Sequence, residues 1–188
     1  MANYSTNEFR GGLKILLDNE PFEILENDVV KPGKGQAFNR VKARSLLSGR
    51  VLERTFKSGE QVAAADTLEV DAQFLYQESD EWHFMNSSTY EQYVANDMAV
   101  GDAGQWIRPQ DKCTVILHNS APIRIVPPNF VELTIKETDP GVRGDTASGG
   151  LKPAVLETGA TVRVPLFINE SDILRIDTRT GEYVGRVK

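Results

Sequence analysis

The sequence predicts an all-β protein made of three small barrels that follow one another along the chain. Two observations favour this class: short runs in which apolar and polar residues alternate, and turn-forming residues that separate these runs at close intervals. The chain has 188 residues, which is more than one typical domain and allows two or three small ones. We place the domains at residues 1–64, 65–128 and 129–188. Three barrels in a line would make a long, thin molecule.

The first domain contains two predicted hairpins. Apolar runs at 13–17 and 22–25 flank the turn at 18–21, which is a composition typical of two paired strands. A second pair of strands flanks the loop at 31–36, whose sequence is Lys-Pro-Gly-Lys-Gly-Gln. In residues 37–45 small or apolar residues alternate with larger and basic ones, as in a strand with one buried and one basic face. Ser48-Gly49 then turns the chain into a partner strand at 51–56, and a small barrel follows.

The alternating pattern restarts at 67–70, after a weak boundary at 58–65. Further strands are predicted at 74–76, 82–85, 112–117 and 123–126. We also expect a short helix, capped by Ser87 or Ser88, that places Tyr90, Tyr93 and Val94 at helical spacing. Strands with one small helix are typical of an OB-like barrel.

The clearest linker is Pro127-Pro128, because neither residue can donate a hydrogen bond to a strand ladder. The third domain starts at Phe130. Its predicted strands are 131–137, 160–168, 173–177 and 182–187, with a glycine-rich loop at 140–150.

Charge is unevenly distributed along the chain. The net charge is -6, but the three thirds carry +2, -7 and -1. A basic stripe runs from residue 31 to residue 57, and it predicts one local anionic partner surface, since the acidic remainder repels phosphate. The basic residues of this stripe are Lys31, Lys34, Arg40, Lys42, Arg44, Arg50, Arg54 and Lys57, against Glu53 alone.

The sequence offers little for catalysis or for a cofactor. His83 and His118 are its only histidines, and neither has cysteines or carboxylates at metal-ligand spacing. Nucleotide-binding and nucleophile-elbow motifs are missing. The single cysteine, Cys113, lies in an apolar run and is expected to be a buried core residue. Without a signal-peptide pattern or an apolar run of about 20 residues, we expect a cytoplasmic protein that does not enter the membrane.

Lys34 is the strongest candidate for a functional residue. Glycines on both sides allow a sharp turn and leave the amine unshielded at the loop tip. A solvated lysine on an ordinary hairpin would have the same sequence, so the loop alone does not decide. A catalytic lysine needs a lowered pKa from an apolar pocket, which a wet hairpin tip does not supply. The exposed position of Lys34 is better suited to an acceptor for covalent modification, or to an arm inserted into another molecule.

Several separated motifs in the chain resemble bacterial elongation factor P. They are the loop at 31–38 with its basic strand, Pro127 to Glu132, Thr138 to Gly141 with Gly144 to Thr146, Arg163 to Phe167, and Asp177 to Tyr183. The resemblance covers essentially the whole chain. One departure is Ser171, which stands where the family signature usually has glycine.

This resemblance implies an L-shaped molecule with an SH3-like (KOW-like) domain followed by two OB-fold domains. It implies a monomer that binds the ribosome between the peptidyl and exit sites, contacts peptidyl-tRNA and ribosomal RNA, stimulates peptide-bond formation and relieves stalling at consecutive prolines. Lys34 would be the modified residue, β-lysylated by an enzyme resembling lysyl-tRNA synthetase and sometimes then hydroxylated.

The other site residues follow from the same resemblance. Lys31, Pro32, Gly33, Gly35 and Gln36 would support the modified lysine. Residues expected to contact RNA are Arg40, Lys42, Arg44, Gly144, Asp145, Thr146, Tyr183 and Arg186. No catalytic residue, metal or cofactor is expected.

Two other interpretations stay open. The first is the related bacterial paralogue of elongation factor P, which typically lacks the lysine tip that this chain has. The second is an OB-fold RNA-binding protein without a role in peptidyl transfer. Such a protein needs a basic groove, and the charge of -7 on the middle third argues against one.

Overall fold

The structure is a computed structural model that describes residues 2–141 and 150–187. It confirms the predicted all-β class. The regular elements of the described residues are strands, apart from a few short helices. Contacts divide the chain into two units, one of Met1–Val70 with Ile116–Arg124 and one of Asp71–Val115 with Ile125–Lys188.

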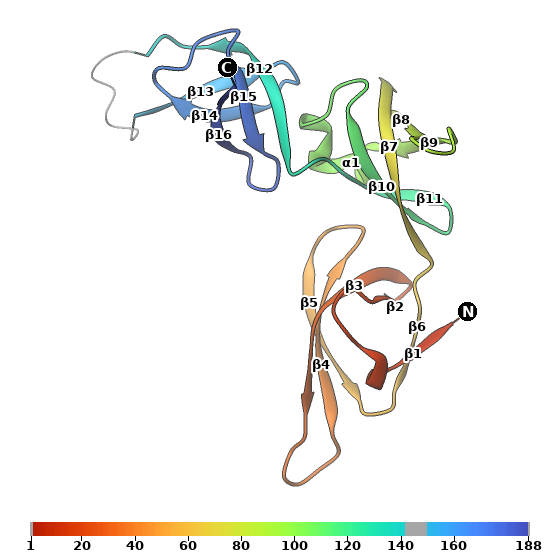
Figure 1. Cartoon of the computed structure of the whole chain (residues 1–188). Helices are drawn as coiled ribbons and strands as arrows, with labels where there is room; N and C mark the ends of the chain where they lie inside the picture. The colour runs from red at the N-terminus through yellow and green to blue at the C-terminus, as the bar shows by residue number, and fades with distance from the viewer. Residues whose placement is uncertain (1, 142–149, 188) are drawn as a thin grey trace. The chain divides into compact units, whose positions relative to one another are not determined.

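The first domain consists of a four-stranded antiparallel sheet in the order β2-β3-β4-β5 and a small pair, β1-β6 (Figure 1). Its elements are β1 (Asn3–Ser5), the 3-10 helix η1 (Thr6–Glu8), β2 (Lys14–Leu17), β3 (Glu20–Val30), β4 (Phe38–Ser45), β5 (Val51–Lys57) and β6 (Gln61–Ala63). The apolar faces of these strands enclose one core, whose buried members are Phe9, Ile15, Leu17, Phe22, Ile24, Val41, Ala43 and Phe56. The predicted hairpins are present, whereas β1 and β6 were not predicted.

The β3–β4 hairpin continues beyond this core, and the side-chain amides of buried Asn39 and half-buried Asn27 hold its base. Asn39 on β4 is 3% exposed, and its Nδ2 donates to Asn27 Oδ1 on β3 at 2.9 Å and to the Thr6 carbonyl at 3.3 Å. Asn27 Nδ2 in turn donates to the Phe9 carbonyl at 3.0 Å. Past these residues the hairpin loses its buried face, since Val29 is 57% exposed. The amides therefore join the hairpin to the N-terminal segment at the level where hydrophobic packing ends.

The second sheet has the order β11-β10-β7-β8-β9. Its elements are β7 (Thr67–Glu78), β8 (Glu81–Asn86), β9 (Gln92–Asn96), the helix α1 (Asp97–Val100), the 3-10 helix η2 (Gly101–Gln105), β10 (Lys112–His118) and β11 (Ala121–Val126).

The helix predicted after Ser87 and Ser88 is wrong. Tyr90 belongs to a turn with φ of 61°, and Tyr93 and Val94 alternate between buried and exposed on the strand β9. The helix starts after Asn96, whose side chain caps it by accepting from the Ala99 amide at 2.9 Å. Asn86 explains the difference, because its Oδ1 accepts from the amides of Ser88 and Thr89 and fixes a tight turn there.

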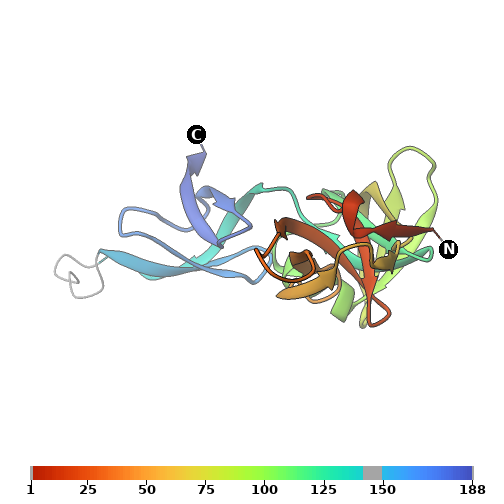
Figure 2. The ribbon, with the colours of Figure 1, turned by 90° about the horizontal axis from the view of Figure 1, so that it is seen from below.

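The third sheet has the order β14-β13-β12-β15-β16, and its edge strands β14 and β16 approach each other, so that the sheet curls toward a barrel (Figures 1 and 2). Its strands are β12 (Phe130–Thr138), β13 (Leu151–Leu156), β14 (Thr161–Pro165), β15 (Ile173–Asp177) and β16 (Glu182–Val187). The predicted strand at 160–168 is shorter here, and β13 was not predicted.

β13 was missed because it contains Pro153, a residue that cannot donate to a ladder. The register shows why proline is tolerated. β12 pairs with β13 only as far as Ala154, and the Pro153 carbonyl accepts from Thr138 Oγ1 at 2.8 Å instead of from a β12 amide. Since a residue's N–H and C=O point to the same side of a strand, the missing N–H of Pro153 also faces the place where the ladder has ended.

Trp106, just after η2, packs inside the core of the third sheet. It is 5% exposed and belongs to a cluster with Leu133, Leu156 and Leu174. Polar contacts surround it: Arg108 pairs with Glu157 at 2.9 Å, and Thr158 Oγ1 donates to the Gln105 carbonyl at 2.7 Å. These contacts join the third sheet to the part of the second sheet that belongs to the same compact unit, residues Asp71–Val115.

We predict that Asn39→Ala lowers the free energy of unfolding by about 1–3 kcal/mol, because it removes the side-chain donor to the Asn27 oxygen and one of the two donors to the carbonyl of buried Thr6. Urea unfolding of the purified protein measures this. Asn7→Ala, at an exposed position of η1, is the control and should change stability by less than about 0.5 kcal/mol. Equal effects of the two changes would show that the amides do not brace the hairpin.

Ser171 has φ of 68°, in the left-handed region that favours glycine. We predict that Ser171→Gly raises the free energy of unfolding by about 0.5–1 kcal/mol, since it removes the Cβ strain and keeps the bond from the Ser171 amide to the Ile135 carbonyl. Ser58→Gly, at a turn position without positive φ, should lower stability instead. Thermal unfolding of both variants tests the difference in sign.

Candidate functional site

Lys34 lies in the loop between β3 and β4, which pair as far as Val30 and Phe38. The loop is at the end of the long hairpin in Figure 1, away from β1 and β6. All residues from Lys31 to Gln36 are exposed. Among the described residues no carboxylate is paired with the Lys34 amine. The amine is therefore open to solvent and to a partner.

The two glycines beside Lys34 contribute differently to this geometry. Gly35 has φ of 122°, a conformation that other residues rarely adopt, and a Cβ there would lie 3.7 Å from Pro32 Cγ. Gly33 has no such φ and has open space around it. Gly35 thus makes the turn, while Gly33 leaves room beside the lysine.

The base of the loop is supported by β5 as well as by the amides described above. Phe38 lies opposite Lys57 on β5, and the Ala37 carbonyl accepts from the Ser58 amide at 3.1 Å. A third strand thus borders the hairpin up to the residue where the loop begins.

The basic stripe is interleaved with carboxylates that lie on neighbouring strands. Arg40 pairs with Glu53 at 3.4 Å, Lys42 with Glu26 at 3.8 Å and Arg44 with Glu23 at 2.9 Å. Arg54 likewise pairs with Asp18 at 3.1 Å. Of these acidic partners the charge count of residues 31–57 included only Glu53, because the other three come from β3 and the turn before it. This strand face is closer to neutral than the sequence suggested.

The cations of the stripe that lack a described ion pair are Lys31, Lys34, Arg50 and Lys57. Lys31 and Lys34 are in the loop, and Lys57 lies opposite Phe38 at the base of the loop. Unpaired positive charge is thus concentrated at the loop end of the hairpin, with Arg50 at the opposite end of β5.

The C-terminal candidates have different surroundings. Tyr183 is half-buried and packs against the core of the third domain. Arg186 is exposed and lies 3.7 Å from Asp172. Gly144, Asp145 and Thr146 lie outside the described residues.

Sequence reasoning missed a cluster on the outer face of β12 and β15. The guanidinium carbons of Arg175 and Arg179 lie 4.8 and 5.4 Å from the ring centroid of Phe130, which is 41% exposed. Arg179 also donates to both carboxylate oxygens of Asp177 and lowers the pKa of that carboxyl. Only the register, which sets Phe130 opposite Asp177, brings these residues together.

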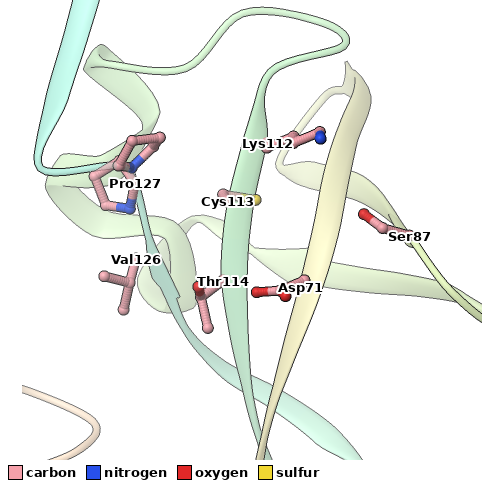
Figure 3. A pocket seen from close by; sticks show the side chains of 8 residues that line it. Asp71, Ser87, Lys112, Cys113, Thr114, Val126 and Pro127 are labelled. Atoms are coloured by element: carbon pink, nitrogen blue, oxygen red, sulfur yellow. The ribbon is translucent and has the colours of Figure 1, made fainter.

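A cavity of about 350 Å³ lies beside β10 and contains the only cysteine (Figure 3). Asp71, Ser87, Lys112, Cys113 and Thr114 line it together with prolines 127 and 128. Burial, helped by the Asp111 carboxylate, raises the pKa of the Cys113 thiol to about 12. The thiol is therefore protonated at neutral pH and is a poor nucleophile.

No group of three or more potential metal ligands occurs in residues 2–141 and 150–187. None of the helices in the same residues has the length and hydrophobicity of a membrane span.

We predict that Cys113 in the folded protein reacts with an aromatic disulfide reagent at pH 8 at least about a hundredfold more slowly than in denaturant, because the thiolate is scarce and covered. Absorbance of the released thiol measures the rate. Rapid stoichiometric labelling of the folded protein would contradict this account.

Models of one protein family match all three domains. They are the elongation factor P (EF-P) KOW-like domain at residues 5–62, the elongation factor P (EF-P) OB domain at 68–125, and elongation factor P, C-terminal, at 131–186.

Two solved structures are similar to this chain to different degrees. The eukaryotic translation initiation factor 5A from Methanococcus jannaschii is 20% identical, with a TM-score of 0.55 over 67% of this chain and 92% of that chain. A translation initiation factor of the same kind from Naegleria fowleri is 12% identical, with a TM-score of 0.49 over 66% of this chain and 97% of that chain. At 20% identity the likeness to the first of these structures concerns the fold alone. With all three domains matched by its models, the chain belongs to the elongation factor P family, a family of non-catalytic translation factors that bind the ribosome.

Proposed function

We propose that this protein binds the ribosome between the peptidyl and exit sites and uses Lys34 to promote peptide-bond formation where consecutive prolines stall it. The observation that carries the proposal is the placement of Lys34: an exposed amine without a described ion pair, between two glycines, at the end of a hairpin with a braced base. The motifs around this loop are those of the family, which supports the same role.

Lys34 serves as an acceptor for β-lysine. An enzyme resembling lysyl-tRNA synthetase supplies β-lysine with an activated carboxyl, the ε-amine attacks it, an amide forms, and the activating group leaves as the amine loses a proton. The exposure of Lys31 to Gln36 leaves room for such an enzyme. The product lengthens the side chain and ends in amines, so the tip stays cationic.

The extended side chain acts by position. Proline is a constrained secondary amine with a poor geometry of attack, and a stalled peptidyl-tRNA samples many unproductive arrangements. An arm that holds its acceptor end restores the alignment of the reacting groups, which is an entropic contribution. The protein supplies no acid, base or nucleophile for this.

Contacts with RNA phosphates hold the protein in place. Lys31 and Lys57 have no described ion pair and can bind phosphate directly, whereas Arg40, Lys42 and Arg44 must exchange a carboxylate for a phosphate. In the third domain Tyr183 and Arg186, together with Gly144, Asp145 and Thr146, are the proposed contacts near the exit site. The protein works as a monomer in the cytoplasm.

We predict that Lys34→Ala slows the translation of a diproline message on purified ribosomes by about tenfold or more, because the arm is lost. Lys34→Arg keeps the charge but offers no amine that can be acylated, so it should behave like Lys34→Ala. Lys136→Ala, at an exposed position of β12, is the control and should match the unchanged protein. Equal rescue by all four proteins would rule out the arm.

Intact-mass and peptide mass spectrometry of natively expressed protein tests the modification separately. We expect the peptide that contains Lys34 to carry the added mass of one β-lysine, with or without one further oxygen. An unmodified Lys34 would remove the β-lysine part of the proposal and leave ribosome binding in place.

A further inference from the structure

The outer face of the second sheet carries an exposed aromatic and aliphatic row. Strand register places Tyr76 on β7 and Val94 on β9 on either side of His83 on β8, so that all three point to one face. Tyr76 stacks on His83, with ring centroids 4.4 Å apart and ring planes at 18°. Tyr76 and Val94 remain 48% and 47% exposed.

Two further rows border this one on the same face. On one side lie Gln73, Met85 and Gln92, which are polar or partly buried. On the other side Glu78 lies directly opposite Glu81, and Asp80 occupies the turn between them. Two like charges in a directly opposed pair destabilise a sheet. None of these three carboxylates is among the ion pairs of the described residues.

The sheet face of an OB-fold commonly binds single-stranded nucleic acid by stacking bases on exposed aromatic rings. This face has the aromatic rings of Tyr76 and His83 but lacks the positive charges that would bind phosphate. Strands β7, β8 and β9 contain no lysine or arginine at all. Phosphates that followed a base onto Tyr76 would meet Glu78, Asp80 and Glu81, with no lysine or arginine on these three strands to offset them.

We propose that this face, made by Tyr76, His83 and Val94 with Glu78 and Glu81 at its edge, docks a basic polypeptide segment of the ribosome. The segment presents an apolar or aromatic side chain to the exposed row and lysines or arginines to the two glutamates. Charge complementarity selects this partner, because a basic segment relieves the repulsion between Glu78 and Glu81, whereas nucleic acid increases it. The proposal rests on ribosome binding by the family and is independent of any modification of Lys34.

Removal of the edge charges distinguishes the two kinds of partner by sign. We predict that Glu78→Gln/Glu81→Gln weakens ribosome binding about threefold to tenfold at low salt, with the difference shrinking as salt is raised. If nucleic acid covered the face, the same change would strengthen binding. Glu137→Gln/Glu170→Gln removes two exposed carboxylates of the third domain and serves as the control. Unchanged or stronger binding by the Glu78/Glu81 variant relative to this control overturns the proposal.

Photocrosslinking identifies what covers the face. A benzophenone amino acid replaces Tyr76 in one full-length protein and Val94 in another, and each is irradiated on purified ribosomes. We expect both positions to link to the same basic protein segment, and to do so equally when Lys34 is changed to alanine. Links to RNA, or no links from protein that still sediments with ribosomes, overturn the inference. Loss of diproline rescue in Lys34→Ala with unchanged crosslinks separates this surface from the arm.

Discussion

The hydrogen bond between half-buried Asn27 and buried Asn39 is the constraint on which the accessible lysine depends. A two-stranded ribbon is marginally stable in water unless another element supports it, and the β3–β4 hairpin leaves its hydrophobic core just where Val29 becomes exposed. At that level the Asn39 amide donates to the Asn27 side-chain oxygen and to the Thr6 carbonyl, and the Asn27 amide donates to the Phe9 carbonyl. The short N-terminal segment thereby supports one side of the hairpin that carries Lys34, and β5 supports the other side as far as Phe38.

Cross-strand pairing also decides where the positive charge of the first domain is available. An exposed ion pair such as Lys42–Glu26 stabilises the fold by only about 0.2–1 kcal/mol. Its larger effect is on the local field, because paired cations attract phosphate less than unpaired ones. Since Arg40, Lys42 and Arg44 all have carboxylate partners, attraction is strongest near Lys31, Lys34 and Lys57 at the loop end. The strand face can still bind RNA, but only by exchanging one anion for another.

Local patterns predicted most of the fold, and the misses share a cause. Alternation along residues 37–45 and the loop at 31–36 are local properties, so the exposed Lys34 and the buried face of β4 could be foreseen. Three features needed the register between distant residues: the carboxylates beside the basic stripe, the Phe130 cluster with Arg175 and Arg179, and the strand that contains Pro153. The spacing of Tyr90, Tyr93 and Val94 is compatible with a helix and with a strand. The segment forms a strand because the Asn86 side chain fixes a tight turn just before it. Ser171 adopts the positive φ of the glycine it replaces, so the turn is retained with strain.

The negative charge of the second domain helps to keep a ribosome-binding protein from binding RNA in the wrong orientation. Phosphate attraction carries no directional information, so a protein that was basic everywhere would bind ribosomal RNA in many orientations. Strands β7, β8 and β9 contain no lysine or arginine and have Glu78 and Glu81 at their edge. Poses that press this part of the sheet onto RNA are therefore unfavourable. The same charges favour a basic protein segment at that face. Repulsion in one domain and a local cluster of unpaired lysines in another therefore act together: the first excludes wrong orientations, and the second gives the remaining one its affinity.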